Sequence, residues 1–261
     1  MTTIAVPPRV DVLGVHVSAV SMAEAVTEIE RWVTEDQRRY VCVTGVHGVM
    51  ESRRDPTLQR IHNDSGLTTP DGMPLVWCAR AAGFGGVERV YGPDLMLEVC
   101  RAGVQAGWRH YFYGGAPGVA EQLADRLSRR FEGLAVAGTW CPPYRELRDD
   151  EVDEVVARVN ASGADIVWVG LSTPKQERWM AAFRERLAAP VLLGVGAAFD
   201  FHAGRVRQAP ALLQRAGLEW AFRLAVEPGR LWRRYLRNNP AFVAAIVRRR
   251  PRPVSAAQPV G

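Results

Sequence analysis

Short apolar segments alternate with amphipathic ones along most of this chain. Residues 9–20, RVDVLGVHVSAV, alternate apolar and polar positions and predict a short hairpin. Ser21 and Glu24 form a capping box, which predicts a helix to about Trp32. The pattern then predicts a strand at 40–44, helical structure over 49–63, a short strand at 66–69 and a helix from about Met73.

The second half of the chain repeats the same rhythm more clearly. The apolar segments at 109–114, 134–140 and 165–170 each lead into an amphipathic segment, and a last apolar segment follows at 191–196. Strands that alternate with helices of ten to fifteen residues are typical of parallel βαβ units. We therefore expect an α/β fold with a Rossmann-like, mostly parallel doubly wound sheet, which binds ligands beyond the carboxyl ends of its strands.

After about residue 201 the pattern changes to helices that are rich in arginine and tryptophan. From residue 201 onward there are twelve arginines, no lysine and two acidic residues, a charge of +10. Since the whole chain carries +5, residues 1–200 carry −5. We predict an α/β domain over 1–204, a basic helical C-terminal appendage over 205–250 that faces an anionic partner, and a disordered tail over 251–261.

Composition narrows the class of protein. A chain of 261 residues with 48% hydrophobic residues can bury a large core. The four cysteines are far apart and mostly lie in apolar segments, which favours core thiols in a reducing compartment over a disulfide framework or a zinc site. The N-terminus does not resemble a secretory signal, and no window of about 18 residues is apolar enough for a membrane span. Any membrane contact is therefore expected to be peripheral.

One loop between a strand and a helix has the features of an anion site. In YGGAPGVAEQL, residues 113–123, Gly114 and Gly115 allow close backbone approach, and Pro117 suits the first turn of a helix. Amides at a helix N-terminus bind anions such as a diphosphate. The motif is neither GxGxxG nor a Walker sequence, so an ordinary tight turn explains it equally well.

A second loop, VGLSTPKQERW at residues 169–179, has the same layout. A capping box accounts for Thr173, Pro174 and Gln176, and spacing alone favours that role. Capping does not account for Lys175 and Glu177, which are placed to contact a nucleotide at the carboxyl edge of the sheet.

Four carboxylate, hydroxyl or imidazole groups lie at the ends of strands or just after them, in positions that suit acid or base chemistry. Asp200 and His202 lie just beyond the strand at 191–196, but an Asp-x-His pair more often anchors a loop and gives weak support for a metal. TTPDG, residues 68–72, is a turn signal. If the strands that end at Thr44 and near Asp71 are neighbours in a parallel sheet, both side chains open on one cleft, where a carboxylate can act as general base.

The arginine-rich segment 217–242 interleaves aromatic residues with arginines and has three interpretations. It fits an interfacial membrane segment, a nucleic-acid patch, or a solvated helix packed on the domain. Arginine without lysine favours bidentate contacts with phosphate. The sequence does not choose an oligomeric state.

Six blocks in register resemble one family. They are TPDGMPLVW, ERVYGPDL, FYGGAPGVAE, VGLSTPKQERW, GVGAAFDFHAG and QRAGLEWAFRLAVEPGRLWRRYL. In order and spacing, from about Val12 to Pro240, they resemble the WecG/TagA/CpsF glycosyltransferases. The resemblance implies a bacterial enzyme, peripheral on the cytoplasmic face of the plasma membrane, that builds cell-surface polysaccharide or teichoic acid. It implies transfer of a sugar from a UDP-sugar to a polyprenyl-diphosphate-linked acceptor, with inversion and without a metal or other cofactor.

The resemblance also implies roles for individual residues. Asp71 matches the proposed general base, and Thr44 matches a threonine of the catalytic cleft. Gln176 matches a glutamine of the cleft, and Arg223, Arg230, Arg233 and Arg234 match the arginines that neutralise the diphosphates. With the loops described above, we expect a UDP-sugar group of Gly114, Gly115, Lys175, Gln176, Glu177 and Asp200, and an acceptor or diphosphate group of His47 and the four arginines.

One departure from the family leaves the transferred sugar open. Many members have Thr-x-Asn after the second strand, whereas this chain reads TGVHG, with Val46 at the asparagine position. Either His47 substitutes for the missing amide, or the sugar differs from the N-acetylmannosamine that the best-known members use.

Three alternatives come from other classes. A non-catalytic membrane-surface scaffold would keep the same blocks. A nicotinamide-dependent oxidoreductase would need GxGxxG after its first strand, which is missing. A nucleic-acid-binding protein fits the basic C-terminus but not the acidic first 200 residues, so we expect no nucleic-acid partner.

Overall fold

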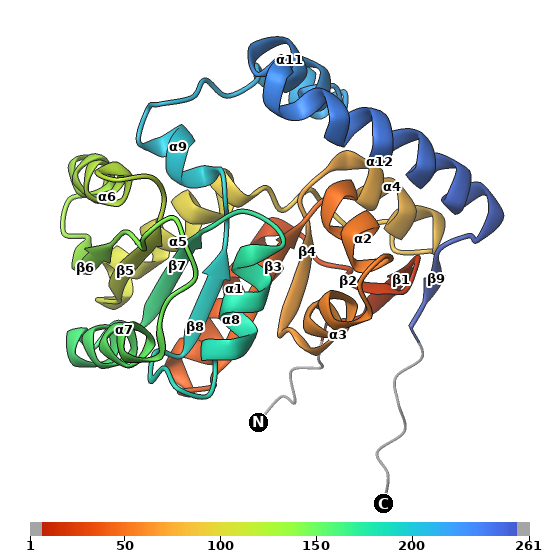
Figure 1. Ribbon diagram of the computed structural model, residues 1–261. Coiled ribbons are helices and arrows are strands. Elements are labelled where there is room, and N and C mark those ends of the chain that lie inside the picture. Colours follow the sequence, from red (N-terminus) through yellow and green to blue (C-terminus); the bar gives the residue numbers. More distant parts are fainter. Residues whose placement is uncertain (1–6, 255–261) are drawn as a thin grey trace, which may run out of the picture. The chain divides into compact units, whose positions relative to one another are not determined.

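The computed structural model describes residues 7–254 and divides into two compact units (Figure 1). Unit 1 comprises Met1–Ala23, Thr44–Val90 and Ala209–Gly261, and unit 2 comprises Glu24–Val43 and Tyr91–Gln208. Residues 1–6 and 255–261, and the side chains of residues 211, 215 and 230, lie outside the described part. Contacts thus group the C-terminal segment from residue 209 with unit 1, while the domain boundary near 205 stays a prediction.

The strands of unit 2 form a parallel sheet. Its strands are β3 (Arg39–Thr44), β5 (Arg109–Gly114), β6 (Ala135–Trp140), β7 (Ile166–Gly170) and β8 (Val191–Gly194). They lie in the order β3-β8-β7-β5-β6, and all four pairings are parallel. The chain runs outward from β5 to β6, then returns to the other side of β5 and continues through β7 to β8. This reversal confirms the predicted doubly wound, Rossmann-like α/β fold, and it places a switch point between β5 and β7.

Helices flank these strands at the predicted places, with two additions. They are α1 (Met22–Thr34), α5 (Gly92–Ala106), α6 (Val119–Arg130), α7 (Asp149–Ser162), α8 (Lys175–Phe183) and α9 (Ala198–His202). The additions are α5 and the short helix α9, which the sequence pattern did not predict. The signals for α5 are Pro93 in the first turn, a buried face with Leu95 and Val99, and Gly107 with φ 73° at the C-cap.

Unit 1 contains a small antiparallel sheet, one further strand and six helices within its described part. The sheet consists of β1 (Arg9–Val12), β2 (Val15–Ser18) and β9 (Arg252–Pro253), and β4 is Leu67–Pro70. The helices are α2 (Val46–Ser52), α3 (Pro56–Asp64), α4 (Met73–Ala81), α10 (Ala211–Arg215), α11 (Glu219–Val226) and α12 (Pro228–Arg248). The hairpin at 9–20 is confirmed. The helical stretch predicted over 49–63 is two helices, because Asp55 accepts hydrogen bonds from the amides of Thr57 and Leu58 and starts a new one.

The end of the chain differs from the expectation of a disordered tail from residue 251. Arg252 and Pro253 pair with Asp11 and Val10 of β1, so antiparallel backbone hydrogen bonds hold this part of the segment. The rest of the predicted tail, residues 255–261, lies outside the described residues.

Helix α12 supplies part of the core of unit 1. Phe242 and Ala245 are buried in a cluster with the inward side chains of β1 and β2 and with Val49 and Leu75. Burial of a phenylalanine side chain stabilises a fold by roughly 1.5–3 kcal/mol. The second half of α12 therefore belongs to the hydrophobic core of unit 1.

The cysteines behave as predicted for core thiols. Cys42, Cys78 and Cys100 are buried, Cys141 is partly buried, and none of these described cysteines forms a disulfide. Burial raises the pKa of the Cys100 thiol to about 12, so it stays protonated and unreactive near neutral pH.

His110 on β5 makes unit 2 sensitive to acid. Its ring is fully buried, Nδ1 accepts a hydrogen bond of 3.1 Å from the indole nitrogen of Trp168, and the two rings stack. Burial lowers the pKa of His110 to about 4, although Asp165 opposes the shift. Since the ordinary value is 6.5, the unfolded chain binds a proton in a pH range where the folded chain does not.

We predict that His110 lowers the free energy of unfolding by up to about 1.4 kcal/mol per pH unit as the pH falls from 6.5 to 4. His110→Asn keeps an acceptor near Nδ1 but cannot bind the proton, so its stability should fall less steeply over this range. Urea unfolding at half-unit pH steps measures the difference. Parallel curves for the two proteins would contradict the assignment.

Candidate active site

The predicted site residues fall into two groups, one in each unit. Unit 2 holds the predicted UDP-sugar group, which is Gly114, Gly115, Lys175, Gln176, Glu177 and Asp200. Unit 1 holds Thr44, His47, Asp71 and the predicted arginines.

Glycines bring the carboxyl ends of β5 and β7 close together at the switch point. Gly114 has φ 119°, and a Cβ atom there would lie 2.7 Å from the carbonyl oxygen of Gly170. The amide of Gly115 donates to that same oxygen at 2.9 Å. A Cβ atom on Gly170 would in turn lie 2.6 Å from the ring of Phe199. The glycines therefore allow β5 and β7 to approach closely, and the Gly115 amide already donates a hydrogen bond within the fold.

Gln176 and Glu177 form a buried polar pair beside the end of β8. Both are almost fully buried, and Glu177 Oε1 accepts from Thr173 Oγ1 at 2.8 Å and from Gln176 Nε2 at 3.2 Å. Within the described residues, Gln176 Oε1 and Glu177 Oε2 have no hydrogen-bond partner. A buried acceptor without a partner costs about 1–3 kcal/mol, so the pair is suited to a ligand that brings N–H or O–H donors.

The capping box predicted at 173–176 is wrong. Helix α8 begins at Lys175 with Pro174 as its N-cap, and no side chain caps it. The hydroxyl of Thr173 bonds Glu177 instead, because that carboxylate is buried and needs donors. Lys175 is exposed, and its ammonium lies 5.4 Å from the centre of the Tyr144 ring.

Asp200 and His202 lie two residues apart on one short helix, α9. His202 Nε2 donates to the carbonyl oxygen of Pro93 at 2.8 Å, and burial lowers the pKa of His202. Among the described residues, no group of three or more His, Cys, Asp and Glu side chains is placed to hold a metal ion.

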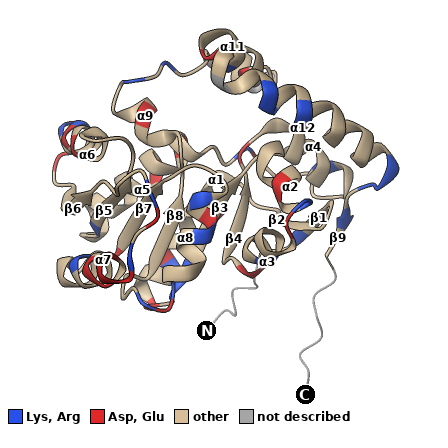
Figure 2. Ribbon diagram, in the orientation of Figure 1, with Lys and Arg blue, Asp and Glu red and all other residues tan. Residues whose placement is uncertain are grey.

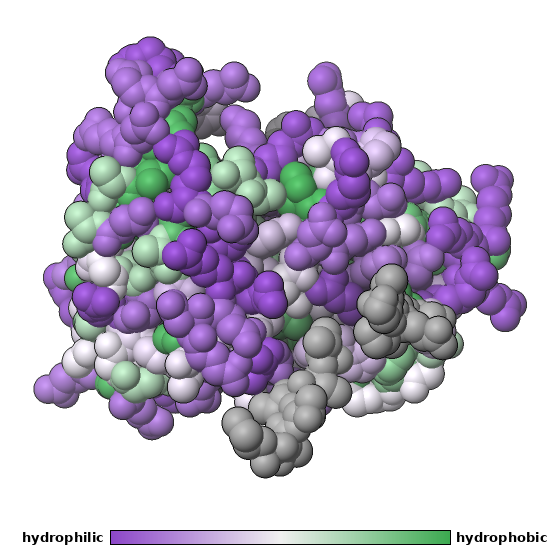
Figure 3. All heavy atoms as spheres, turned by 90° about the horizontal axis from the view of Figure 1, so that it is seen from below, coloured by the Kyte–Doolittle hydropathy of each residue, from purple (hydrophilic) through white to green (hydrophobic). Residues whose placement is uncertain are grey.

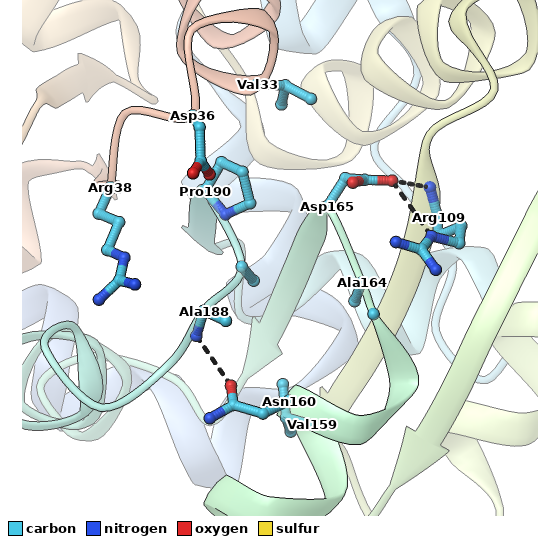
Figure 4. Close-up of a pocket in the computed structure, with 12 residues that line it drawn as sticks. Val33, Asp36, Arg38, Arg109, Val159, Asn160, Ala164, Asp165, Ala188 and Pro190 are labelled. Carbon is cyan, nitrogen blue, oxygen red and sulfur yellow. Dashed lines mark hydrogen bonds and ion pairs between the residues drawn. The ribbon is translucent and has the colours of Figure 1, made fainter.

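A polar pocket of about 420 Å³ lies at the opposite edge of the sheet in unit 2 (Figure 4). Arg38, Arg109, Asp165 and Pro190 line it, and each lies at the start of a strand or just before one. Asp165 accepts from the amide of Arg109 at 2.7 Å. This pocket contains none of the predicted site residues.

Thr44 and Asp71 lie next to each other in unit 1. The amide of Asp71 donates to the carbonyl oxygen of Thr44 at 3.0 Å, and Nε of Arg89 donates to the Asp71 carbonyl at 2.5 Å. Between the two site residues, a Cβ atom on Gly45 would lie 3.8 Å from Asp71 Oδ2. The turn that carries the carboxylate is thus held by its backbone beside the threonine.

A histidine that the sequence reading did not select lies behind Thr44. His62 is fully buried on α3, and its Nε2 lies 2.9 Å from Thr44 Oγ1. A single histidine in an amphipathic helix is most often a core residue, so the sequence offered no signal for this contact.

Val46 and His47, where the sequence departs from the family pattern, have different surroundings. Val46 packs against the hydrophobic cluster of unit 1, so no polar group replaces the asparagine there. Nδ1 of His47 lies 3.0 Å from Asn238 Nδ2, while Asn238 Oδ1 accepts from Arg54 at 2.9 Å. Since that amide nitrogen must then be the donor, His47 Nδ1 is the acceptor and the ring is tied to α12.

The arginines of the predicted diphosphate group lie on α11 and α12. Arg223 and Arg234 are partly buried, whereas Arg233 is exposed, with its guanidinium 5.2 Å from the centre of the Trp232 ring. Nothing is described for the side chain of Arg230. Basic residues recur along α12 (Figure 2).

Arg89 connects the turn at Asp71 to this C-terminal segment. Besides the Asp71 carbonyl, its guanidinium contacts Glu219 in an ion pair and Gln214 Oε1 at 3.0 Å. The turn and helices α10 and α11 are therefore joined through one side chain.

Together these features define a Rossmann-like α/β protein with a buried polar site at the carboxyl edge of its sheet, a type of site that binds nucleotides and similar ligands. The chain belongs to the glycosyl transferase WecG/TagA/CpsF family, which it matches over residues 10–255.

Relatives with assigned names support the same membership. An N-acetylglucosaminyldiphosphoundecaprenol N-acetyl-beta-D-mannosaminyltransferase of Bacillus spizizenii (strain ATCC 23059 / NRRL B-14472 / W23) is 31% identical over 198 residues, which cover 76% of this chain and 74% of the relative. A protein of the same name from Bacillus subtilis (strain 168) is 27% identical over 186 residues, with 71% and 70% covered.

Proposed function

We propose that this protein is an inverting, metal-independent glycosyltransferase with a UDP-sugar donor and a polyprenyl-diphosphate-linked sugar as acceptor. The transferred group is a hexose or N-acetylhexosamine, and the product enters cell-surface polysaccharide or teichoic acid. The observation that carries the proposal is the family match over residues 10–255. The names of both relatives give a diphosphoundecaprenol-linked acceptor.

The donor is assigned to the group in unit 2. A sugar nucleotide presents hydroxyl and N–H donors, which suit the oxygens of Gln176 and Glu177 that have no partner in the described part. Its diphosphate suits the N-terminus of α6, beyond Gly114 and Gly115, where the helix dipole favours negative charge. Lys175 and Asp200 complete the proposed donor group.

The chemical step is assigned to unit 1. Asp71 accepts the proton of the acceptor hydroxyl, that oxygen forms a bond to the anomeric carbon, and the bond from this carbon to UDP breaks. Thr44 positions the acceptor beside the carboxylate, and His47 contacts its sugar. Charge on the diphosphates is stabilised by Arg223, Arg230, Arg233 and Arg234 together with helix N-termini.

Helix α12 supports a peripheral position on the cytoplasmic face of an anionic membrane. Its buried positions Leu231, Asn238, Phe242 and Ala245 share one side, whereas a second apolar stripe is exposed. The stripe consists of Trp232 (45% exposed), Leu236 (66%), Val243 (61%) and Val247 (74%). Spacings of 4, 7 and 4 residues keep this stripe on one face, beside exposed arginines that suit lipid phosphates.

The face of the protein shown in Figure 3 offers weaker support for membrane attachment than the apolar stripe of α12. On the face shown in Figure 3, hydrophilic side chains predominate and hydrophobic ones appear in small separate patches. Within residues 7–254, no helix is both long and apolar enough to cross a membrane.

The function is tested by release of UDP from a panel of UDP-hexoses and UDP-N-acetylhexosamines with a short prenyl-diphosphate-linked N-acetylglucosamine acceptor. We expect release with one donor, unchanged by EDTA.

Asp71→Asn should lower turnover by at least about 10²-fold through loss of the base while UDP still binds. Asp64→Asn, an exposed carboxylate of unit 1, is the matched control and should keep the rate. Release by no donor would favour the scaffold alternative, and a normal rate for Asp71→Asn would remove Asp71 as the base.

Membrane attachment is tested by sedimentation with vesicles that contain phosphatidylglycerol. Leu236→Glu with Val243→Glu should reduce the bound fraction at least tenfold, because two charges then face the lipid. Tyr144→Glu, on an exposed apolar side chain of unit 2, should bind as the wild type does. Equal binding of all three proteins would assign the attachment elsewhere.

A further inference from the structure

His62 is held from three directions by groups of unit 1. Nδ1 lies 3.0 Å from the carbonyl oxygen of Leu58 and 3.1 Å from Ser52 Oγ, and Nε2 lies 2.9 Å from Thr44 Oγ1. The ring is fully buried, and Ser52 and Thr44 are each 1% exposed. Every polar contact that the ring makes in the described part is therefore with a carbonyl or a hydroxyl.

These contacts assign the proton on the ring. A carbonyl oxygen can only accept, so the short contact with Leu58 requires hydrogen on Nδ1. The neutral ring carries one hydrogen, so Nε2 then has none. Nε2 is therefore the unprotonated nitrogen, which accepts a hydrogen bond.

The assignment on His62 fixes the hydroxyl of Thr44. Because Nε2 accepts, Thr44 Oγ1 donates its only hydrogen to the histidine. Toward any ligand, the same oxygen then offers lone pairs and no hydrogen. The carbonyl of this threonine also accepts the amide of Asp71, so one residue positions both the hydroxyl and the turn with the carboxylate.

The residues packed around His62 and Thr44 hold the two side chains in this arrangement. The backbone oxygen of His62 accepts hydroxyls from Ser65 at 2.7 Å and Thr68 at 2.8 Å, which fixes the end of α3. A Cβ atom on Gly48 of α2 would lie 2.8 Å from the methyl group of Thr44 and 3.6 Å from His62 Nε2. The pair thus fits only because residue 48 has no side chain.

We propose that His62 is a positioning residue that makes the Thr44 hydroxyl an obligate hydrogen-bond acceptor for the substrate. The acceptor sugar would donate a hydroxyl or amide N–H to Thr44 Oγ1, which orients it so that its attacking hydroxyl faces Asp71. This inference rests on the proposed function for its kinetic consequence, but not for the proton assignment.

Two substitutions of His62 distinguish its hydrogen bond to Thr44 from a contribution of the ring to packing alone. His62→Gln can place an acceptor where Nε2 lies, whereas His62→Asn keeps only a group near Nδ1. We expect His62→Asn to lower kcat/KM about tenfold, the effect of one hydrogen bond of about 1.4 kcal/mol, and His62→Gln to recover most of it. Equal losses in the two variants, at equal thermal stability, would overturn the proposal.

A double-mutant cycle identifies the residue through which His62 acts. Thr44→Val removes the hydroxyl and should cost about as much as His62→Asn, and the double variant should be no slower than either single one. Losses that multiply would mean that His62 acts through another group.

The proton assignment is tested without turnover, on the full-length protein at neutral pH. Long-range ¹H–¹⁵N correlation spectra should show His62 Nδ1 as the protonated nitrogen and Nε2 as the unprotonated one, and Thr44→Val should shift the Nε2 signal. Hydrogen on Nε2 would overturn the inference even if the protein is an active glycosyltransferase. The predicted tautomer in a protein inactive with every donor would instead leave the assignment standing and contradict the proposed function.

Discussion

The hydrogen bond from the Asp71 amide to the Thr44 carbonyl is the constraint on which the site in unit 1 depends. It joins the turn after β4 to the last residue of β3, and other contacts reinforce both partners. Arg89 holds the carbonyl of Asp71 and reaches Glu219 and Gln214, while His62 holds the hydroxyl of Thr44. The turn that carries the Asp71 carboxylate is thereby held through its backbone, between two apolar segments.

Much of the fold could be predicted from the sequence because buried parallel strands are continuous apolar runs, and β5, β7 and β8 lie where such runs occur. Helix boundaries that depend on single side chains were harder to predict. Asp55 divides one predicted helical stretch into α2 and α3, and α5 was missed although Pro93 and Gly107 mark its two ends. The pairing of β9 with β1 joins residues more than 240 positions apart, a contact that local patterns do not encode.

The site was predictable where a residue follows a strand and less so where its role comes from burial. Thr44 and Asp71 lie together at the ends of their strands as expected. In contrast, helix capping explained Thr173 and Gln176 until their buried contacts with Glu177 were known. His62 lies eighteen residues after Thr44 and carries no motif, so only the packing of α3 reveals their contact. The roles of the predicted arginines stay predictions.

In the proposed reaction Asp71 is the base of a single direct displacement, and the configuration of the product distinguishes this step from a double displacement. The one-bond ¹H–¹³C coupling at the anomeric carbon of the newly formed linkage, measured by NMR on the isolated product, reports its configuration. A single displacement should give a configuration opposite to that of the sugar in the UDP-sugar donor. Retention of the donor configuration would contradict a single displacement and the role of Asp71 as its base.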